Sequence, residues 1–243
     1  MLSRNEVKYI QSLCHKKQRQ QEGVFIAEGP KIIKEILLSD YRIIKIYAIQ
    51  AEAEHYSTSH SNVVAITENE LKNISVLQTP NKVLALVEQK KEEEQIDLHN
   101  QWTLMLDDIQ DPGNFGTIIR IADWFGIKNI ICSNGTADLY NPKVIQSTMG
   151  SFTHVNIFYK DLKSFLQNNV IAVYGAVLNG TNIFSVNKNK EGIVLIGNEG
   201  KGINKELQQF INQPVTIPKI GNAESLNAAI ATGIIISQLL SIG

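Results

Sequence analysis

Hydrophobic and polar positions alternate in blocks along the chain, and these blocks predict strands and helices in turn. Before residue 90 we predict strands at 23–27, 43–49, 62–66 and 83–88, helices at 5–20, 31–38 and 68–74, and a polar turn after residue 49. Beyond residue 101 we predict strands at 102–106, 128–132, 155–158, 170–177, 193–196 and 214–217, with helices at 114–125, 142–148, 161–167, 203–210 and 225–240. Strands that alternate with helices indicate a parallel α/β sheet covered on both faces. The apolar runs at 170–173 and 194–196 are typical of buried parallel strands.

A run of charged residues at 90–97, KKEEEQID, divides this pattern into two parts. Such a run has little to bury and is typical of a linker. We therefore expect two domains, at residues 1–95 and 101–243. Three histidines, His55, His60 and His99, lie in polar surroundings without the spacing of metal ligands.

The charge of the chain is balanced overall but uneven along the sequence. The formal net charge is −1, so no global positive field indicates a polyanionic partner. The first 21 residues, however, carry one acidic residue, Glu6, against five cations: Arg4, Lys8, Lys16, Lys17 and Arg19. Such a segment either contacts nucleic acid or forms a solvated helix face.

The two cysteines, Cys14 and Cys132, are far apart and belong to no metal-binding motif. Their number and spacing predict neither a disulfide framework nor a zinc site, and favour a reducing compartment. The first residues contain no continuous apolar stretch, and no run approaches the length of a membrane span. We therefore expect a soluble cytoplasmic protein.

One stretch, residues 106–126, combines a strand end, an acidic turn and an amphipathic helix. Pro112 and Gly113 break the strand, and we expect Asn114 at the N-cap of the helix. The chain has 23 basic residues, of which four are arginines, and Arg120 is the only arginine after residue 100. Because guanidinium and ammonium groups differ in geometry, this choice suggests a specific partner. The alternative is a surface salt bridge to Asp123 or Asp107.

Two more loops that follow predicted strands are rich in glycine and polar residues, at 196–202 and 217–227. Ligands of open α/β sheets bind beyond the carboxyl ends of the strands, so the three loops can share one pocket. The loops match neither the G-x-G-x-x-G dinucleotide pattern nor a P-loop, and no nucleophile elbow is present. We expect group transfer from a bound donor to a positioned acceptor.

Three motifs in these loops resemble those of the SpoU-type (TrmH-like) RNA 2′-O-ribose methyltransferases, of the trefoil-knot SPOUT superfamily. They are N-x-G-x-I-I-R from Asn114 to Arg120, I-G-N-E-G-x-G-I from Ile196 to Ile203, and I-P followed by S-L-N-A-A-x-A up to Ala231. FIAEGPKII, from residue 25 to 33, is similar to the family's accessory ribosomal-protein-like RNA-binding domain. The resemblance implies that the last helix threads a deep trefoil knot, although knots are almost absent elsewhere.

The resemblance also implies the reaction, the donor and the residues of the site. S-adenosylmethionine would be the donor, without a metal, and structured RNA the acceptor, with ribosomal RNA favoured over transfer RNA. A homodimer would form through the C-terminal domain. Residues implied for the donor site are Gly197, Ile217, Leu226, Leu178, Asn198 and Ile196. Residues implied for catalysis are Arg120, Asn114, Glu199, Ser225 and Asn227. The chain departs from the family at Gln146, where many relatives have an arginine.

A sulfonium methyl group is already a good electrophile, so the protein has to align the ribose hydroxyl and manage its proton. Guanidinium groups are poor bases, so Arg120 is better suited to holding a phosphate or a developing alkoxide than to acting as a base. Asn114 and Glu199 are expected to orient it. Two other hypotheses remain. The chain could be an RNA-binding or assembly factor with an idle methyltransferase site, or a nicotinamide oxidoreductase, although it lacks the G-x-G-x-x-G pattern of that class.

Overall fold

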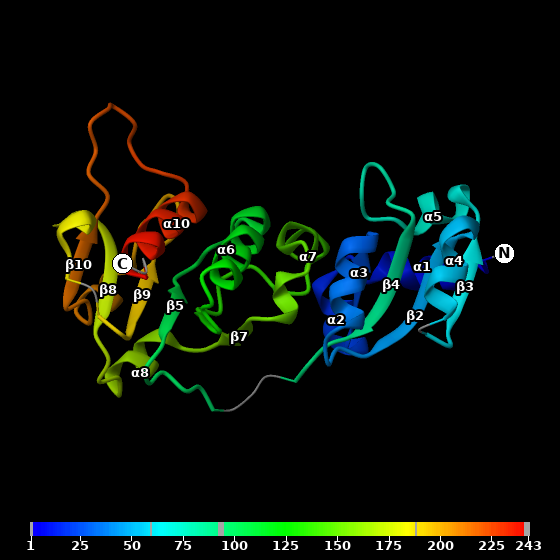
Figure 1. Ribbon diagram of the computed structural model, residues 1–243, viewed down its shortest axis with the longest axis horizontal. Helices are drawn as coiled ribbons and strands as arrows, with labels where there is room; N and C mark the ends of the chain where they lie inside the picture. Colours follow the sequence, from blue (N-terminus) through cyan, green and yellow to red (C-terminus); the bar gives the residue numbers. More distant parts are fainter. Residues whose placement is uncertain (1, 59, 92–94, 188, 241–243) are drawn as a thin grey trace. The chain divides into compact units, whose positions relative to one another are not determined.

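The computed structural model describes residues 2–58, 60–91, 95–187 and 189–240. The chain forms two compact units. The first comprises Met1–Lys91 together with Asp138–Thr153, and the second comprises Glu92–Ala137 together with His154–Gly243. Each unit is an α/β structure with its own sheet (Figure 1). Residues 92–94 of the predicted linker lie outside the described residues.

The described residues of the first unit form a four-stranded mixed sheet with the order β1-β4-β2-β3. Its strands are β1 (Val24–Glu28), β2 (Ile43–Ile49), β3 (Val63–Ile66) and β4 (Val83–Glu88). Strand β4 runs antiparallel to β1 and β2, and β2 runs parallel to β3. The helices are α1 (Arg4–Ser12), α2 (Lys16–Glu22), α3 (Pro30–Leu37), α4 (Gln50–Ser57), α5 (Glu68–Ile74) and, from the second segment, α7 (Pro142–Thr148), which precedes the 3-10 turn η1 (Ser151–Thr153).

The first unit differs from the sequence prediction at two helices. The single helix predicted over 5–20 is broken into α1 and α2, because His15 has extended backbone at the start of α2. The polar turn predicted after residue 49 is helix α4, whose buried residues are only Ala53 and Tyr56. Two buried positions in eight residues give almost no helical periodicity, so this helix was missed.

The described residues of the second unit form a six-stranded sheet with the order β10-β8-β9-β5-β6-β7. Every pairing in it is parallel, which confirms the predicted parallel α/β sheet. The strands are β5 (Trp102–Leu106), β6 (Asn129–Cys132), β7 (Asn156–Tyr159), β8 (Val173–Asn182), β9 (Gly192–Ile196) and β10 (Gln213–Thr216).

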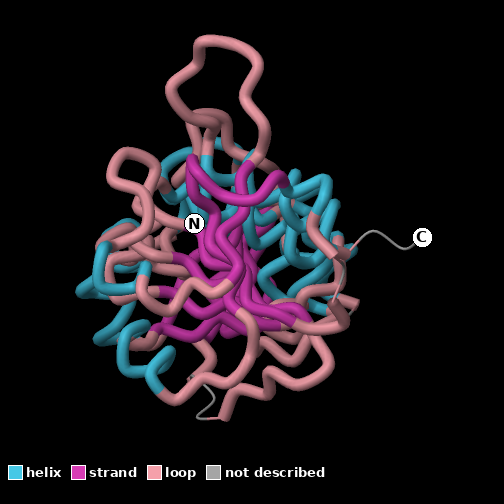
Figure 2. Tube along the Cα trace, turned by 90° about the vertical axis from the view of Figure 1, so that its left-hand side faces the viewer, coloured by secondary structure: helices cyan, strands magenta, loops and turns pink. Residues whose placement is uncertain are grey.

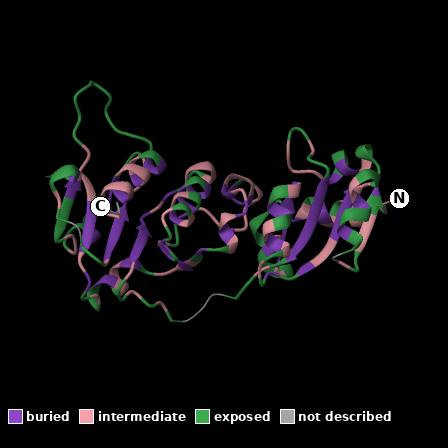
Figure 3. Ribbon diagram, viewed as in Figure 1, coloured by how far each residue is buried: buried purple, intermediate pink, exposed green. Residues whose placement is uncertain are grey.

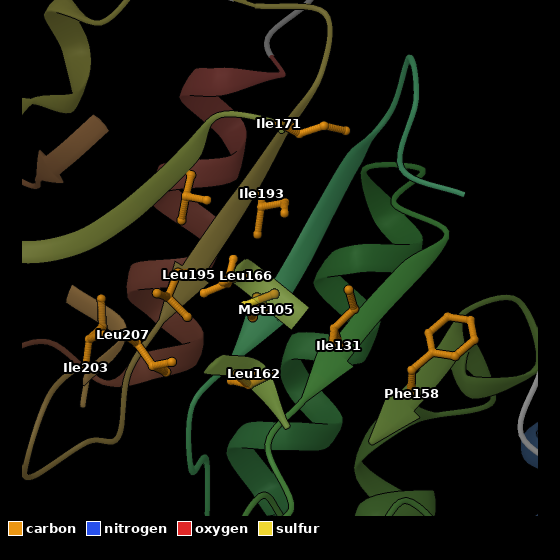
Figure 4. Close-up of a cluster of buried hydrophobic side chains, with 11 residues drawn as sticks. Met105, Ile131, Phe158, Leu162, Leu166, Ile171, Ile193, Leu195, Ile203 and Leu207 are labelled. Carbon is orange, nitrogen blue, oxygen red and sulfur yellow. The ribbon is translucent and has the colours of Figure 1, made fainter. Parts of the chain in front are cut away.

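Helices cover this sheet on both faces, as predicted. They are α6 (Pro112–Trp124), α8 (Leu162–Gln167), α9 (Lys205–Gln208) and α10 (Ala228–Leu239), with the 3-10 turn η2 (Ile183–Ser185). On one face, Leu162, Leu166 and Leu207 from α8 and α9 pack with Met105 and Leu195 of the central strands (Figure 4). On the other face, α6 and α10 contact each other (Figure 1). Figure 2 shows the strands as a central layer with helices on either side.

Several predicted boundaries in the second unit are wrong: the strand predicted at 170–177 ends at Asn182, the helix at 203–210 is Lys205–Gln208, and the helix at 225–240 begins at Ala228. Two further starts are wrong for clear local reasons. The strand predicted at 170–177 begins at Val173, and Val170 is 90% exposed. There the Asn169 side chain accepts from the Ile171 amide and donates to the Ile171 carbonyl, which makes a turn. The helix predicted from residue 114 begins at Pro112, because proline suits the first helical position.

Candidate functional site

The three loops singled out in the sequence follow β5, β9 and β10, at the carboxyl ends of these parallel strands (Figure 1). The first loop leads into α6, whose N-cap is Asp111 and not, as predicted, Asn114. The Asp111 side chain accepts from the Asn114 amide at 2.8 Å, so the backbone of Asn114 is already satisfied. The Asn114 side chain is therefore free of a capping role.

Side chains from all three loops meet in a short hydrogen-bond array, which we call the amide–carboxylate array: Asn227, Asn114 and Glu199. The Asn114 Nδ2 donates to Glu199 Oε1 at 2.9 Å, and Asn227 Nδ2 donates to Asn114 Oδ1 at 2.8 Å. Asn227 also caps α10, since its Oδ1 accepts from the amides of Ala229 and Ile230. The array thus joins the starts of α6 and α10 to the loop after β9.

Arg120 lies on α6, about one and a half turns beyond Asn114, and its side chain is exposed. Within the described residues it has no hydrogen bond and no ion pair. Neither salt bridge considered from the sequence is present there: Asp123 lies 3.3 Å from His154 Nδ1, and the Asp107 carboxylate accepts from a backbone amide. Asn114 and Glu199 bond to each other, and within the described residues neither has a hydrogen bond to the guanidinium. Arg120 is therefore an exposed cation with no partner in the described part of the chain.

The loop after β9 is closed by its own backbone. Asn198 and Gly202 exchange two hydrogen bonds, of 3.1 and 2.9 Å, and the Asn198 Oδ1 accepts from the amides of Gly200 and Lys201. A Cβ on Gly197 would lie 2.3 Å from the backbone of Gly202, so only glycine fits there without a shift. Ile196, the last residue of β9, is 3% exposed. The loop is a preformed backbone turn at the carboxyl end of β9.

The loop between β10 and α10 extends from the unit as a long exposed excursion (Figures 1 and 3). Ile217 at its start is half-buried, whereas Ser225 is exposed and, within the described residues, makes no hydrogen bond. Leu226 is 47% exposed, and Leu178 on β8 is 77% exposed. Of the predicted site residues, the structure therefore joins Asn114, Glu199 and Asn227 by hydrogen bonds and leaves Leu178 and Leu226 open to solvent.

The arrangement can accept a nucleoside sulfonium donor. The closed turn after β9 presents backbone groups at close range, and Leu178 and Leu226 offer exposed apolar surface for an adenosine moiety. Among the described residues, no group of three or more His, Cys, Asp or Glu side chains is placed to hold a metal ion.

The structure adds two acidic residues, Asp107 and Asp108, of which the sequence suggested only Asp107, as a possible salt-bridge partner of Arg120. The buried Asp107 accepts from the Asn204 amide at 2.7 Å through Oδ2. Asp108, with φ of 56°, accepts from Ser133 Oγ at 2.6 Å, and its carbonyl accepts from Asn198 Nδ2 at 2.8 Å. These bonds hold the loop after β9 against the end of β5. The sequence feature that could have indicated this role is the pair of carboxyls directly after the buried strand β5.

Burial of the Asp107 carboxyl raises its pKa above the ordinary value of 3.8, and the charge of Asp108 adds to this. Because the folded-state pKa exceeds the unfolded one, stability from this group is fully present below about pH 4 and is lost as the pH rises through the folded-state pKa. We predict that Asp107→Asn, which keeps an acceptor, gains stability relative to wild type between about pH 4 and pH 7. Urea unfolding at both pH values measures this.

The control is Asp161→Asn at the N-cap of α8. Its backbone hydrogen bond from Ser164 lowers the pKa of Asp161, so the sign is reversed. The stability from Asp161 is present above its unfolded-state pKa of about 3.8 and is lost as the pH falls through the lower folded-state pKa. This variant should therefore lose stability relative to wild type as the pH rises towards about 4, and should change little between about pH 4 and pH 7. Equal pH dependence for both variants would contradict the assignment of Asp107 as a carboxyl destabilised by burial.

Comparison with known proteins agrees with this geometry. The model of the SpoU rRNA Methylase family matches residues 101–237, and the model of the MRM3-like substrate binding domain matches residues 4–85. The 23S rRNA (guanosine(2553)-2'-O)-methyltransferase RlmP of Bacillus subtilis is 32% identical over 248 residues, which cover 96% of this chain and 95% of that protein.

Solved structures show the same similarity over the whole chain. A Porphyromonas gingivalis chain assigned to the TrmH family has 37% identity and a TM-score of 0.88, with 98% of both chains covered. The AdoMet-bound rRNA methyltransferase from Sinorhizobium meliloti has 29% identity and a TM-score of 0.88, covering 98% of this chain and 96% of that one.

These matches over nearly the whole chain place it in the class of RNA methyltransferases that these relatives represent. The chain belongs to the SpoU rRNA Methylase family, with an MRM3-like substrate binding domain at its N-terminal end. The recognition made from the three motifs is confirmed.

Proposed function

We propose that the RNA on which this chain acts is the 23S ribosomal RNA, methylated at one ribose 2′-hydroxyl. The coarser activity follows from the family: the chain is an S-adenosylmethionine-dependent RNA 2′-O-ribose methyltransferase. The observation that supports the ribosomal substrate most strongly is the similarity to RlmP over 96% of the chain, both domains included. The two relatives modify different nucleosides of 23S ribosomal RNA: RlmP modifies a guanosine, and a second relative, from Streptomyces viridochromogenes, modifies a uridine.

In the proposed reaction the donor supplies an activated methyl group, and the residues of this chain position the acceptor. We assign the donor site to Ile196, Gly197, Asn198, Leu178, Ile217 and Leu226. The exposed guanidinium of Arg120 would hold a phosphate of the RNA or stabilise charge that develops on the ribose oxygen. The amide–carboxylate array of Asn114, Glu199 and Asn227 would fix the loops around the ribose, with Ser225 brought in from the long loop.

The experiment that tests the substrate compares ribose-methylation maps of total RNA from cells with and without the gene. We expect one 2′-O-methyl position in 23S ribosomal RNA to disappear and to return with the wild-type gene. A methylation lost from transfer RNA alone would overturn the ribosomal assignment. Unchanged maps together with altered ribosome assembly would favour the alternative, an assembly factor with an idle methyltransferase site.

We propose that the methyltransferase domain is residues 101–243 and the RNA-binding domain residues 1–95. On the latter, the first two helices would provide a cationic contact to RNA, because Arg4, Lys8, Lys16 and Lys17 are all exposed. Arg19, counted with them in the sequence, is 1% exposed and ion-paired with Asp138, so the patch consists of four cations and not five. We also propose that α10 threads a deep trefoil knot, as the family resemblance implies.

We propose a homodimer that packs through α6 and α10. These helices touch at Ile121 and Gly233, where a Cβ on the glycine would lie 3.6 Å from Ile121 Cδ1. Beside this contact the pair exposes large apolar side chains: Trp124 is 85% exposed and Ile230 57%. Apolar surface of this kind on paired helices is typical of a protein interface.

The corresponding prediction is that Trp124→Glu is a monomer at micromolar concentration, whereas wild type is a dimer in sedimentation. A charge placed in the core of the interface would have to be desolvated without a partner. The matched control, Leu38→Glu, changes an apolar side chain that is 75% exposed in the other unit and should leave the dimer intact. A wild-type monomer in an active preparation would contradict the dimer.

We also propose that the transfer needs no metal and takes place in the cytoplasm. The sulfonium carbon is electrophilic without a Lewis acid, so alignment and charge stabilisation suffice. Methyl transfer that survives a chelator would support the absence of a metal.

No helix among the described residues is long and apolar enough to cross a membrane.

A further inference from the structure

The segment Asp138–Thr153, which we call the junction segment, lies between β6 and β7 in the sequence but packs in the first unit. It contains α7 and η1, and the SpoU family model spans it. Residues on either side of it, up to Ala137 and from His154, belong to the second unit. The methyltransferase part of the sequence therefore supplies a structural component of the substrate-binding unit.

A buried arginine holds the first residue of the junction segment. Arg19 is 1% exposed, and its Nη2 donates to Asp138 Oδ2 at 2.5 Å. Its Nη1 donates to the carbonyls of Leu13 and Cys14, at 3.0 and 2.8 Å. The Arg19 Nε is buried and has no partner within the described residues. Buried ion pairs add little stability over apolar side chains of similar volume, so this pair is better explained by the position that it fixes.

Aromatic packing holds the rest of the junction segment against the same unit. The ring of Tyr140 lies 4.7 Å from that of Phe25, and the ring of Phe152 lies 5.2 Å from that of Tyr41. The Tyr140 hydroxyl also accepts from the Lys90 amide at 3.0 Å. Rings packed in this way form a rigid attachment, because each contact buries a large apolar area.

Both ends of the junction segment adjoin residues that hold helix α6. Ala137, one residue before it, donates from its amide to the Ile109 carbonyl at 2.9 Å, just ahead of α6. His154, one residue after it, lies 3.3 Å from Asp123 Oδ2 in the last turn of α6. The helix that carries Asn114 and Arg120 is thus held near its start and near its end by the direct neighbours of the junction segment.

We infer that the junction segment sets the position of α6, and that Arg19 and Asp138 are positioning residues for methyl transfer. RNA that binds the first unit would act on α6 through this segment, because one peptide bond separates the Asp138 ion pair from the Ala137 hydrogen bond. A displacement of Arg120 by about 1 Å would be enough to slow the reaction strongly. The inference rests on the proposed function, since it assumes that RNA binds the first unit.

The test is Asp138→Asn, with Glu52→Gln as the matched control. The second variant removes a carboxylate from another ion pair of the same unit, Lys82–Glu52 at 2.9 Å, which does not involve the junction segment. With 23S ribosomal RNA and S-adenosylmethionine both saturating, we expect kcat to fall about tenfold or more in Asp138→Asn. The Kd values for RNA and donor should stay within about twofold of wild type, and Glu52→Gln should keep the wild-type kcat.

A second variant and a second readout keep the test decisive if Asp138→Asn does not fold. His154→Ala changes a half-exposed side chain and should lower kcat with unchanged Kd values. In hydrogen exchange, RNA bound to wild type should slow exchange in 138–153 and in α6 together, and His154→Ala should lose the effect in α6 alone. Wild-type kcat in a folded variant, or a loss confined to RNA affinity, would overturn the inference. Failure of the proposed function would differ, because wild type itself would then not methylate this RNA.

Discussion

Arg120→Lys should lower the rate of methyl transfer by roughly 10²-fold or more, the scale of losing one preorganised donor. Arg120 is exposed and, within the described residues, has no intramolecular partner, so its planar fork is available for RNA. Lysine keeps the charge but cannot reproduce two parallel N–H donors. Donor affinity and melting temperature should barely change, because no contact within the described part of the protein is lost. Single-turnover methyl incorporation measures the rate, calorimetry measures donor affinity, and a thermal melt measures the melting temperature.

The matched control is Arg42→Lys, the same change at an exposed arginine that pairs with Glu88 at 3.2 Å. Exposed ion pairs contribute about 0–1 kcal/mol, so this variant should behave as wild type. If Arg120→Lys also turns over at a near-normal rate, the guanidinium is not needed and the assignment of the catalytic face of α6 is wrong.

Gly197→Ala should weaken the binding of S-adenosylmethionine by roughly 10- to 100-fold. The new Cβ would meet the backbone of Gly202 and the amide of Ile203, both at 2.3 Å, and backbone cannot rotate away as a side chain can. Overpacking of this kind costs about 1–3 kcal/mol, and about 1.4 kcal/mol corresponds to a factor of ten in Kd. The closed turn after β9 would have to open. Calorimetry with donor and with its demethylated product measures the loss.

Gly200→Ala, in the same loop, is the control for this prediction. A Cβ there would meet only Asn198 Oδ1 at 3.7 Å, an ordinary contact, so donor binding should stay within about twofold of wild type. Equal loss in both variants would indicate a general sensitivity of the loop. Wild-type affinity in Gly197→Ala would remove this turn from the donor site.

The elements that the sequence predicted best are those with a strong hydrophobic periodicity or with residues at their ends that break a strand or helix. The strands of the second unit and the helix at 142–148 were found because apolar runs end at glycine, proline or asparagine. Helix α4 was missed because its polar surface is interrupted by only two buried residues. The strand at β8 was placed too early because Val170 is apolar but exposed, a difference that tertiary packing decides.

The site was predictable as a set of loops and not as a set of contacts. The motifs brought Asn114, Glu199 and Asn227 to attention, but the bond between Asn114 and Asn227 spans 113 residues, and no local pattern encodes it. Arg19 shows the reverse case. Its neighbours in sequence made it look like part of a basic surface, whereas its partner, Asp138, lies 119 residues away. Long-range pairings of this kind depend on the fold as a whole.

One measurement tests the central claim most directly. The purified protein is incubated with S-adenosylmethionine bearing a deuterated methyl group and with unmodified 23S ribosomal RNA, which is then digested to nucleosides for mass spectrometry. The account predicts one deuterated methyl group per RNA, attached to the ribose 2′-oxygen of a single nucleotide. A label on a base, or no label although the donor is bound, would contradict it.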